Sequence, residues 1–236
     1  IRAMELKLRA LDGVITIESL TGELHRGRLE LQGVFDGKHN RAKLATNGSL
    51  VGLDIATALA AAEADPNLSG TANLAWQLTS RGRTGNELVA ALKGPVKLTT
   101  EQVVLHELGI EGMLCQAVAL TNQEALTASF PNSSSFQTLS IDIKLADGKA
   151  RLRPLQADLP NIALRGTGEY DLVSRDFDTS FKAKLAPGLE QLDRACRVSK
   201  RLIAIEWPVD CVGNTATDPG QWCRVDTEEV IEDLAT

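Results

Sequence analysis

The sequence is poor in aromatic residues, in histidine and in long apolar stretches. Aromatic residues are 4% of the 236 positions, and the formal net charge is −6. A chain of this kind, without a cluster of lysines and arginines, offers neither a basic surface nor a platform of rings for nucleic acid. No stretch reaches the roughly 18 apolar residues of a transmembrane helix, and no signal peptide is recognisable. We therefore expect neither nucleic acid as a partner nor a membrane span within these residues.

The sequence also lacks recognisable catalytic and metal-binding patterns. His25, His39 and His106 are far apart, and none has a second ligand at a metal-binding spacing. No phosphate-binding glycine-rich loop and no G-x-S-x-G elbow occur, and the Gly-Thr-Gly at 166–168 lies within a strand-like pattern. The carboxylates fall mostly on polar strand faces or at helix starts. We predict no catalytic residue, no metal and no cofactor, and hence a protein that is not an enzyme.

Alternating apolar and polar residues dominate the chain, most clearly between residues 136 and 185. Asp12-Gly13 and Asp147-Gly148 are pairs typical of tight hairpin turns. The alternation shifts by one residue near Pro154, which indicates a β-bulge. Because side chains alternate across a strand, each predicted strand has one apolar face. The positions expected to share that face are Ile141, Ile143, Leu145, Leu152, Ile162, Leu164, Phe177 and Phe181.

Four short helical patterns interrupt the strands. They cover residues 54–65, 84–94, 107–122 and 226–235, with Asp54, Thr84 and Asp226 as expected N-caps, Glu87 completing a capping box and Gly94 as a stop. The serine-rich segment 129–138 is predicted to be a solvated loop. Strands and helices do not alternate regularly, which argues against a parallel sheet. The predicted fold is mostly β with short helices (α+β): a curved antiparallel β-sheet with three to four short helices packed on one face or end.

The four cysteines are spaced for disulfides and not for a metal site or redox catalysis. No two of Cys115, Cys196, Cys211 and Cys223 stand in a C-x-x-C motif, and Cys211 and Cys223 bracket a turn-rich loop. An even number of cysteines, two of which bracket a turn-rich loop, favours disulfide bonds and therefore an oxidising compartment. We expect the pairs Cys211–Cys223 and Cys115–Cys196, with Cys196–Cys211 as the main competing pair. A disulfide that closes a loop as long as the one after Cys211 stabilises the folded state by about 3 kcal/mol.

Several short motifs, in their order and spacing, resemble the C-terminal region of the AsmA family. "LVGLD" (50–54) leads into a helix, "LSG" (68–70) opens a strand, "GRTGNELVAALKG" (82–94) is a helix that ends in L-x-G, and "GTGEYDL" (166–172) is a strand. Each motif is degenerate by itself, but the resemblance covers nearly the whole chain.

The resemblance implies a bacterial envelope protein that an upstream helix anchors in the inner membrane and that otherwise lies in the periplasm. It also implies similarity to bridge-like lipid-transfer proteins, in which a curved β-sheet presents an apolar groove to phospholipid. Residues 1–236 would be one C-terminal domain of a longer chain, with 1–50 continuing an upstream sheet and 214–236 forming a disulfide-stapled tail and terminal helix. The shared-face residues given above would line the groove. Its function would be to shield acyl chains during transport between the inner and outer membranes, and so to support outer-membrane homeostasis.

The apolar face is open to two interpretations. The alternation alone fits an ordinary core that short helices cover, whereas the resemblance favours a lipid groove over at least part of the sheet. A second hypothesis for the function is a protein-interaction module that supports the assembly of outer-membrane proteins. In that case Trp207 and Trp222 would anchor an envelope protein partner.

Overall fold

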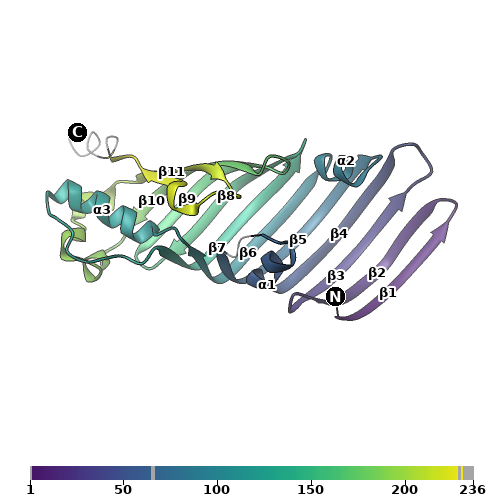
Figure 1. Ribbon diagram of the computed structural model, residues 1–236, viewed down its shortest axis with the longest axis horizontal. Helices are drawn as coiled ribbons and strands as arrows, with labels where there is room; N and C mark the ends of the chain where they lie inside the picture. Colours follow the sequence, from purple (N-terminus) through teal and green to yellow (C-terminus); the bar gives the residue numbers. More distant parts are fainter. Residues whose placement is uncertain (1, 65–66, 228–229, 231–236) are drawn as a thin grey trace.

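The computed structural model describes residues 2–64, 67–227 and 230. Within them, the strands form one twelve-stranded antiparallel sheet whose spatial order is the order in the sequence (Figure 1). The strands are β1 (Arg2–Leu11), β2 (Val14–Leu24), β3 (Gly27–Asp36), β4 (Ala42–Asp54), β5 (Leu68–Gly82), β6 (Gly94–His106), β7 (Ser133–Ala146), β8 (Lys149–Leu159), β9 (Ile162–Asp171), β10 (Asp176–Leu185), β11 (Trp207–Asn214) and β12 (Cys223–Val225). The α-helices are α1 (Ile55–Ala61), α2 (Gly85–Ala90), α3 (Ile110–Asn122) and α4 (Lys200–Ala204). The predicted fold class, mostly β with short helices, is confirmed.

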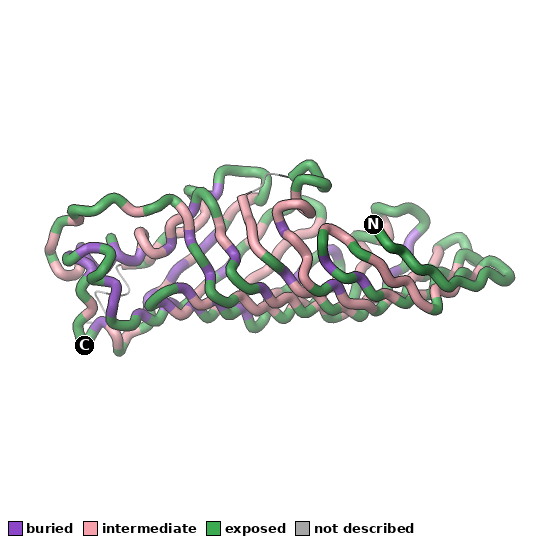
Figure 2. Tube along the Cα trace, turned by 90° about the horizontal axis from the view of Figure 1, so that it is seen from below, coloured by how far each residue is buried: buried purple, intermediate pink, exposed green. Residues whose placement is uncertain are grey.

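The sheet is long and narrow, with its first strand at one end and the helix α3 near the other (Figure 1). α1 and α2 lie at opposite edges of the sheet, and both pack against β5. Figure 2, turned by 90°, shows the helices and long loops gathered on one side of the sheet. One face of the sheet is therefore covered in part, by α1 and α2 at its edges beside β5 and by α3 toward its C-terminal end.

Two glycine-containing hairpin turns and the bulge near Pro154 are present as predicted, and further register shifts occur between other strands. Asp12 and Gly13 have φ values of 47° and 74°, and Asp147 and Gly148 have 52° and 76°, which are the left-handed conformations that a tight hairpin needs. In β8, Leu152 pairs with Ile143 and Leu155 with Ile141, so two residues around Pro154 stand opposite one. This bulge keeps Leu152 and Leu155 on the same face despite their odd spacing.

The register aligns one row of side chains across all twelve strands. Residues directly opposite in an antiparallel pair point to the same face, so each member of the row lies on one side of the sheet. This central row consists of Leu6, Leu20, Leu31, Gly48, Trp76, Val96, Ile143, Leu152, Gly168, Thr179, Cys211 and Cys223. A second row on the same face consists of Leu29, Leu50, Leu74, Leu98, Ile141, Leu155, Gly166, Phe181, Val209 and Val225. Neither row contains a charged residue.

Burial along this face changes from one end of the sheet to the other. β1 is exposed along its whole length, including Met4 at 54% and Leu8 at 54%. The largest fully buried side chains lie at the opposite end, among them Leu114 of α3, Leu189 and Val209. Figure 2 shows this as buried segments concentrated toward the end of the sheet that carries β11 and β12. The hydrophobic core is thus the part of the apolar face that α3 and residues 186–206 cover.

The helix starts agree with the predicted caps, whereas one predicted stop is wrong. Asp54 accepts a hydrogen bond from the Thr57 N–H at 2.9 Å, and Thr84 accepts one from the Glu87 N–H at 3.2 Å. α2 ends at Ala90, and Gly94 is instead the first residue of β6, with a φ of 139°. A glycine is needed there because a Cβ would collide with the backbone of β5. The predicted terminal helix over 226–235 lies almost wholly outside the described residues.

The serine-rich segment 129–138 is not the solvated loop that its composition predicts. β7 begins at Ser133, and the side chain of Ser134 is fully buried. Its hydroxyl donates to the Leu108 carbonyl and accepts from the Ile110 N–H, both at 2.7 Å. Gly109 is the N-cap of α3 and has no side chain to cap the helix, so Ser134 satisfies the first turn from a neighbouring strand.

The glycines of the strand β9 leave room for side chains of the strand β10. A Cβ at Gly166 would collide with the backbone oxygen of Ser180 and lie 2.8 Å from Cδ1 of Phe181. We therefore expect Gly166→Ala to lower the free energy of unfolding by about 1–3 kcal/mol, because a tightly packed contact must open. Chemical denaturation measures the change. Gly85→Ala is the control: no atom lies within 4 Å of its Cβ position, and the fold should be unchanged or up to about 1 kcal/mol more stable.

Candidate functional site: an apolar cavity on the sheet

A cavity of about 540 Å³ lies on the apolar face, over the part of the sheet from the start of β5 to β12. No charged side chain is among the described residues that line it. The central row contributes six residues to its wall: Val96, Ile143, Leu152, Thr179, Cys211 and Cys223. Leu108 and Ile110, at the start of α3, border it on one side. The volume is that of an ordinary small-molecule site, but the polar groups that usually orient a polar ligand are few.

The structure brings most of the predicted groove residues together at this cavity. Seven of the eight line it, and they are Ile141, Ile143, Leu145, Leu152, Leu164, Phe177 and Phe181. Ile162 does not: it is 2% exposed and lies in the core, paired with Leu159 and Leu185. It alternates correctly with the other apolar residues of β9, but it belongs to the core cluster with Leu185 and Leu189 and does not line the cavity. Whether the cavity holds lipid stays a prediction.

The tail of the chain forms one wall of the cavity. Residues 215–222, which we call the tail loop, lead from β11 back to β12, and Thr215 and Trp222 line the cavity. The Trp222 ring meets Phe177 edge to face at a centroid distance of 5.0 Å. Its Nε1 donates to the Thr217 hydroxyl at 3.1 Å. A Cβ on Gly220 would lie 3.3 Å from the backbone oxygen of Glu107, so the loop reaches from β11 to the segment between β6 and α3.

The hypothesis that Trp207 anchors a partner is wrong. Trp207 is 0% exposed, and its Nε1 donates to the Leu202 carbonyl at 3.2 Å. It stands opposite Ala183 in β10 and belongs to the core. Of the two tryptophans, only Trp222 is partly exposed. The sequence did not indicate which tryptophan is buried, because both lie close to a cysteine of the same turn-rich stretch.

Both disulfides have the expected pairing. Cys211 and Cys223 stand directly opposite each other in β11 and β12, with their Cα atoms 4.0 Å apart. Cys115 of α3 pairs with Cys196, which is 81 positions further along the sequence, with the Cα atoms 5.0 Å apart. The first bridge ties the tail loop to the end of the sheet. The second ties α3, which borders the cavity, to the 3₁₀-helix η2 (Arg194–Cys196).

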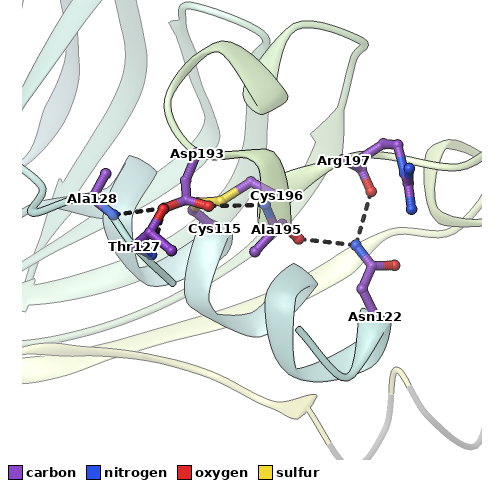
Figure 3. Close-up of a disulfide and its surroundings, with 8 residues drawn as sticks. All are labelled: Cys115, Asn122, Thr127, Ala128, Asp193, Ala195, Cys196 and Arg197. Carbon is purple, nitrogen blue, oxygen red and sulfur yellow. Dashed lines mark hydrogen bonds between the residues drawn. A yellow bond between two sulfur atoms is a disulfide. The ribbon is translucent and has the colours of Figure 1, made fainter. Parts of the chain in front are cut away.

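A hydrogen-bonded carboxylate reinforces the second bridge (Figure 3). Asp193 is 6% exposed and accepts hydrogen bonds from the N–H groups of Ala195 at 2.8 Å and of Ala128 and Thr127 at 2.7 Å. These bonds to the charged form lower the pKa of its carboxyl from 3.8 to about 2. Asn122, at the end of α3, donates to the carbonyls of Ala195 and Arg197, both at 3.0 Å. This role of Asp193 could not be predicted from the sequence, because its partners Ala128 and Thr127 lie 65 and 66 residues away.

Asp193→Asn is expected to lower stability at neutral pH and to lose this effect in acid. A carboxylate whose pKa is depressed by folding stabilises the fold above its unfolded pKa, near 3.8, and this contribution is lost as the pH falls toward about 2. The thermal midpoints of the wild type and the variant should therefore differ most at neutral pH and converge in this window. Asp142→Asn, on the exposed face of β7, is the control. A difference that stays constant with pH would show that the carboxylate charge is not the cause.

Glu111, in the first turn of α3, is a carboxyl in an apolar setting. Burial is the largest influence on its pKa and raises it, against hydrogen bonds from its own backbone, Ser134 and Ser135. Its Oε2 is buried and finds no hydrogen-bond partner among the described residues. Protonation is therefore easier here than in water.

The other face of the sheet is charged and solvated. Ion pairs join neighbouring strands there, among them Lys149–Glu169, Arg165–Asp158 at 3.0 Å and Arg9–Glu18 at 2.7 Å.

Among the described residues, no three His, Cys, Asp or Glu side chains gather in a way that would hold a metal ion. The part of the chain that the structure describes also has no helix long and apolar enough to cross a membrane.

The fold and the cavity define a class of protein: a long, one-sided β-sheet domain with an apolar cavity on one face. The AsmA family model matches residues 1–155, and the chain belongs to the AsmA family. It is 24% identical over 177 residues to Protein AsmA of Escherichia coli (strain K12), covering 75% of this chain and 29% of that protein. The chain thus spans less than a third of the length of this relative. No solved structure matches the chain. Membership of the family indicates a function associated with the cell envelope.

Proposed function

We propose that this chain is a non-enzymatic lipid-handling domain that shields phospholipid acyl chains on the apolar face of its sheet. In the full-length protein it would lie in the periplasm, anchored to the bacterial inner membrane by an upstream segment. Its task would be phospholipid transport between the inner and outer membranes and the homeostasis of the outer membrane. The two disulfides support this location, because disulfides persist in oxidising compartments such as the periplasm.

The observation that carries the proposal is the uncharged central row and the cavity that lies on it. The row runs across all twelve strands without a charged residue, and the cavity occupies its C-terminal half. Transfer of an acyl chain from water to such a surface is favourable by about 0.8 kcal/mol for each buried CH₂. A soluble monomer rarely leaves so large an apolar surface uncovered without a function.

The exposed end of the row fits a domain that continues a longer groove. Met4, Leu6 and Leu8 of β1 are 54%, 42% and 54% exposed, on the same face as the cavity. The far edge of β1 pairs with no strand among the described residues. In this proposal, residues 1–50 extend a sheet formed by the preceding part of the protein, and the cavity is the terminal part of one continuous apolar surface.

Native mass spectrometry of this chain, purified from bacterial membranes and kept free of detergent, tests the proposal. We expect the protein to carry mass adducts that lipid extraction identifies as phospholipids or their acyl chains. Protein that binds no lipid, and that takes none up from vesicles of phosphatidylethanolamine and phosphatidylglycerol, would contradict the proposal.

A second candidate function is a protein-interaction module that supports outer-membrane protein assembly. The partly exposed Trp222 favours it, because tryptophans are enriched in the energetically important centres of interfaces. With Trp207 buried, Trp222 is the remaining anchor of this hypothesis. If it holds, Trp222→Ala should weaken recovery of an envelope protein in a pull-down while leaving the lipid content unchanged. Loss of lipid without loss of a partner would favour the first function.

A further inference from the structure

Apart from the cysteines, four of the described residues that line the cavity have a polar side-chain atom, and only two of these atoms are engaged. The Thr179 hydroxyl donates to the Cys211 carbonyl at 3.2 Å, and Trp222 Nε1 donates to a hydroxyl of the tail loop at 3.1 Å. The hydroxyls of Tyr170 and Thr215 have no hydrogen-bond partner among the described residues. They are therefore the lining groups that remain available to a polar ligand.

The two available hydroxyls belong to the same end of the cavity. Tyr170 of β9 stands opposite Phe177 of β10, Phe177 stands opposite Gly213 of β11, and Thr215 follows two residues later. The Thr215 N–H donates at 3.1 Å to the carbonyl of Arg175, in the turn between β9 and β10. We call this end of the cavity, with Tyr170, Arg175 and Thr215, the mouth.

The cavity is open at the mouth and closed at the other end of the same strands. Along β9, Leu164 is buried, whereas Tyr170 is half-buried. Along β11, Val209 is buried, whereas Thr215, directly after the strand, is exposed. A headgroup placed among the uncharged, buried residues would lose its water without gaining a partner. The polar end of an amphiphilic ligand is therefore best placed at the mouth.

The length of the cavity along β9 fits this placement. Tyr170 and Leu164 both line the cavity, and the strand between them is about 20 Å long at roughly 3.3 Å for each residue. One acyl chain spans about half of the roughly 30 Å hydrocarbon core of a bilayer. A chain whose polar end lies at Tyr170 thus lies wholly within the apolar part.

The turn at the mouth also supplies charges of both signs. The guanidinium of Arg175 is exposed and has no ion pair or hydrogen bond among the described residues. The carboxylates of Asp171 and Asp176 accept hydrogen bonds from the Ser174 N–H at 2.9 Å and from Asn214 Nδ2 at 2.7 Å. One cation beside two carboxylates disfavours a purely anionic ligand and suits a headgroup that carries both a phosphate and an ammonium group.

We infer that the mouth receives the zwitterionic headgroup of a phospholipid, with Tyr170 and Thr215 donating to its oxygens and Arg175 pairing with its phosphate. The inference rests on the proposed function and adds to it the site of the headgroup. Because β10 separates β9 from β11, Tyr170 and Thr215 start at least about 10 Å apart. They therefore suit a glycerol and phosphate group and not a lone carboxyl. The acyl chain extends from the mouth along the strands toward Leu164.

Displacement of a bound fluorescent fatty acid by two ligands tests the headgroup site. Palmitoyl lysophosphatidylethanolamine and monopalmitoylglycerol carry the same acyl chain, and only the first has a phosphate. The double variant Tyr170→Phe/Thr215→Val should bind both ligands about tenfold more weakly, because two hydrogen bonds are lost. Arg175→Gln should weaken binding of the phosphate-bearing ligand alone, again by about tenfold.

Thr167→Val is the matched control for the hydroxyl variants. Thr167 lies on the same strand as Tyr170, is exposed on the opposite face and stands opposite Ser180. Its replacement also removes a hydroxyl from β9, and it should change the affinity for neither ligand. Circular dichroism checks that each variant is folded.

Photo-crosslinking gives an independent test of the orientation. Two forms of the lysophospholipid carry a diazirine either next to the ester or at the terminal carbon of the chain. After trypsin digestion, the ester-proximal diazirine should label mainly the peptide 166–175, which contains Tyr170 and Arg175. The terminal diazirine should label mainly the peptides 152–165 and 98–144, which carry the buried part of the lining.

The outcomes separate the headgroup site from the proposed function. Wild-type affinity in the Tyr170→Phe/Thr215→Val variant, an equal loss in Thr167→Val, or a reversed labelling pattern overturns the headgroup site while the lipid-handling function stands. An Arg175→Gln variant that binds both ligands like the wild type overturns the pairing with phosphate. Failure of both ligands and of vesicle lipids to bind the wild-type chain overturns the function, and the headgroup site with it.

Discussion

Replacing Cys115 and Cys196 together by alanine is expected to lower the free energy of unfolding by about 4–5 kcal/mol. The bridge joins residues 81 apart, and in the chain-entropy model the stabilisation grows with the length of the closed loop. Alanine is the better replacement, because both cysteines are 0% exposed and a serine would bury a hydroxyl. Such a loss is a large part of the 5–15 kcal/mol that typical domains have, so α3 should leave the sheet under mild denaturation.

The second bridge supplies the comparison for this prediction. Cys211 and Cys223 are only 12 residues apart, so their double replacement by alanine should cost about 3 kcal/mol by the same model. Urea denaturation of the three proteins, followed by circular dichroism, gives the two differences. A smaller loss for Cys115/Cys196 than for Cys211/Cys223 would show that the structure of α3 and not the closed loop sets the stability of this end.

Removal of the Cys115–Cys196 bridge should also affect the cavity, since α3 borders it. Leu108 and Ile110 line it, and Ile110 is held by the buried Ser134 hydroxyl at 2.7 Å. Without the bridge, Asn122 still connects the end of α3 to η2 by a hydrogen bond, and Asp193 connects the segment after α3 to η2. The cavity should therefore persist in the reduced protein at neutral pH. It should be lost at lower denaturant concentration than in the oxidised protein.

The sequence predicted the strands and their apolar faces, because alternation is a local property. It did not predict how those faces line up, because register depends on bulges. The bulge in β8 was visible through Pro154, but β2 pairs with β1 and β3 through register shifts near Glu18 and Ser19, where the residue types give no signal. Only with all these shifts in place do Leu6 at one end and Cys223 at the other belong to a single row.

The residues of the cavity, like the strands, could be predicted only in part. The alternation of apolar and polar residues placed seven of the eight predicted residues at the cavity. It did not do so for Ile162, because alternation does not show which part of an apolar face other segments cover. Long-range contacts were also out of reach: Ser134 looks like a loop residue, and Asp193 looks like any helix cap, until their partners from other elements are seen. The wall that the tail loop forms likewise arises from the chain folding back after β11.

Leu152→Asp is expected to reduce the binding of acyl chains by about a hundredfold or more while the domain stays folded. Leu152 lies in the central row, lines the cavity and is only half buried. A carboxylate there would face a bound hydrocarbon chain without a partner, at a cost of several kcal/mol, and each 1.4 kcal/mol changes affinity tenfold. Leu164→Asp would not be informative, since Leu164 is 2% exposed and belongs to the core, where a charge would unfold the protein.

Gln156→Asp is the matched control for this prediction. Gln156 lies on the same strand, is exposed on the charged face, and stands opposite Arg165 and Ser140. Both variants add one negative charge to β8, so a general electrostatic effect on lipid would appear in both. Binding is measured by titration with a fluorescent fatty acid, and folding by circular dichroism. Equal loss of binding in the two variants would assign the effect to net charge and would contradict a site on the apolar face. Loss in Leu152→Asp alone would place the acyl chain against the central row.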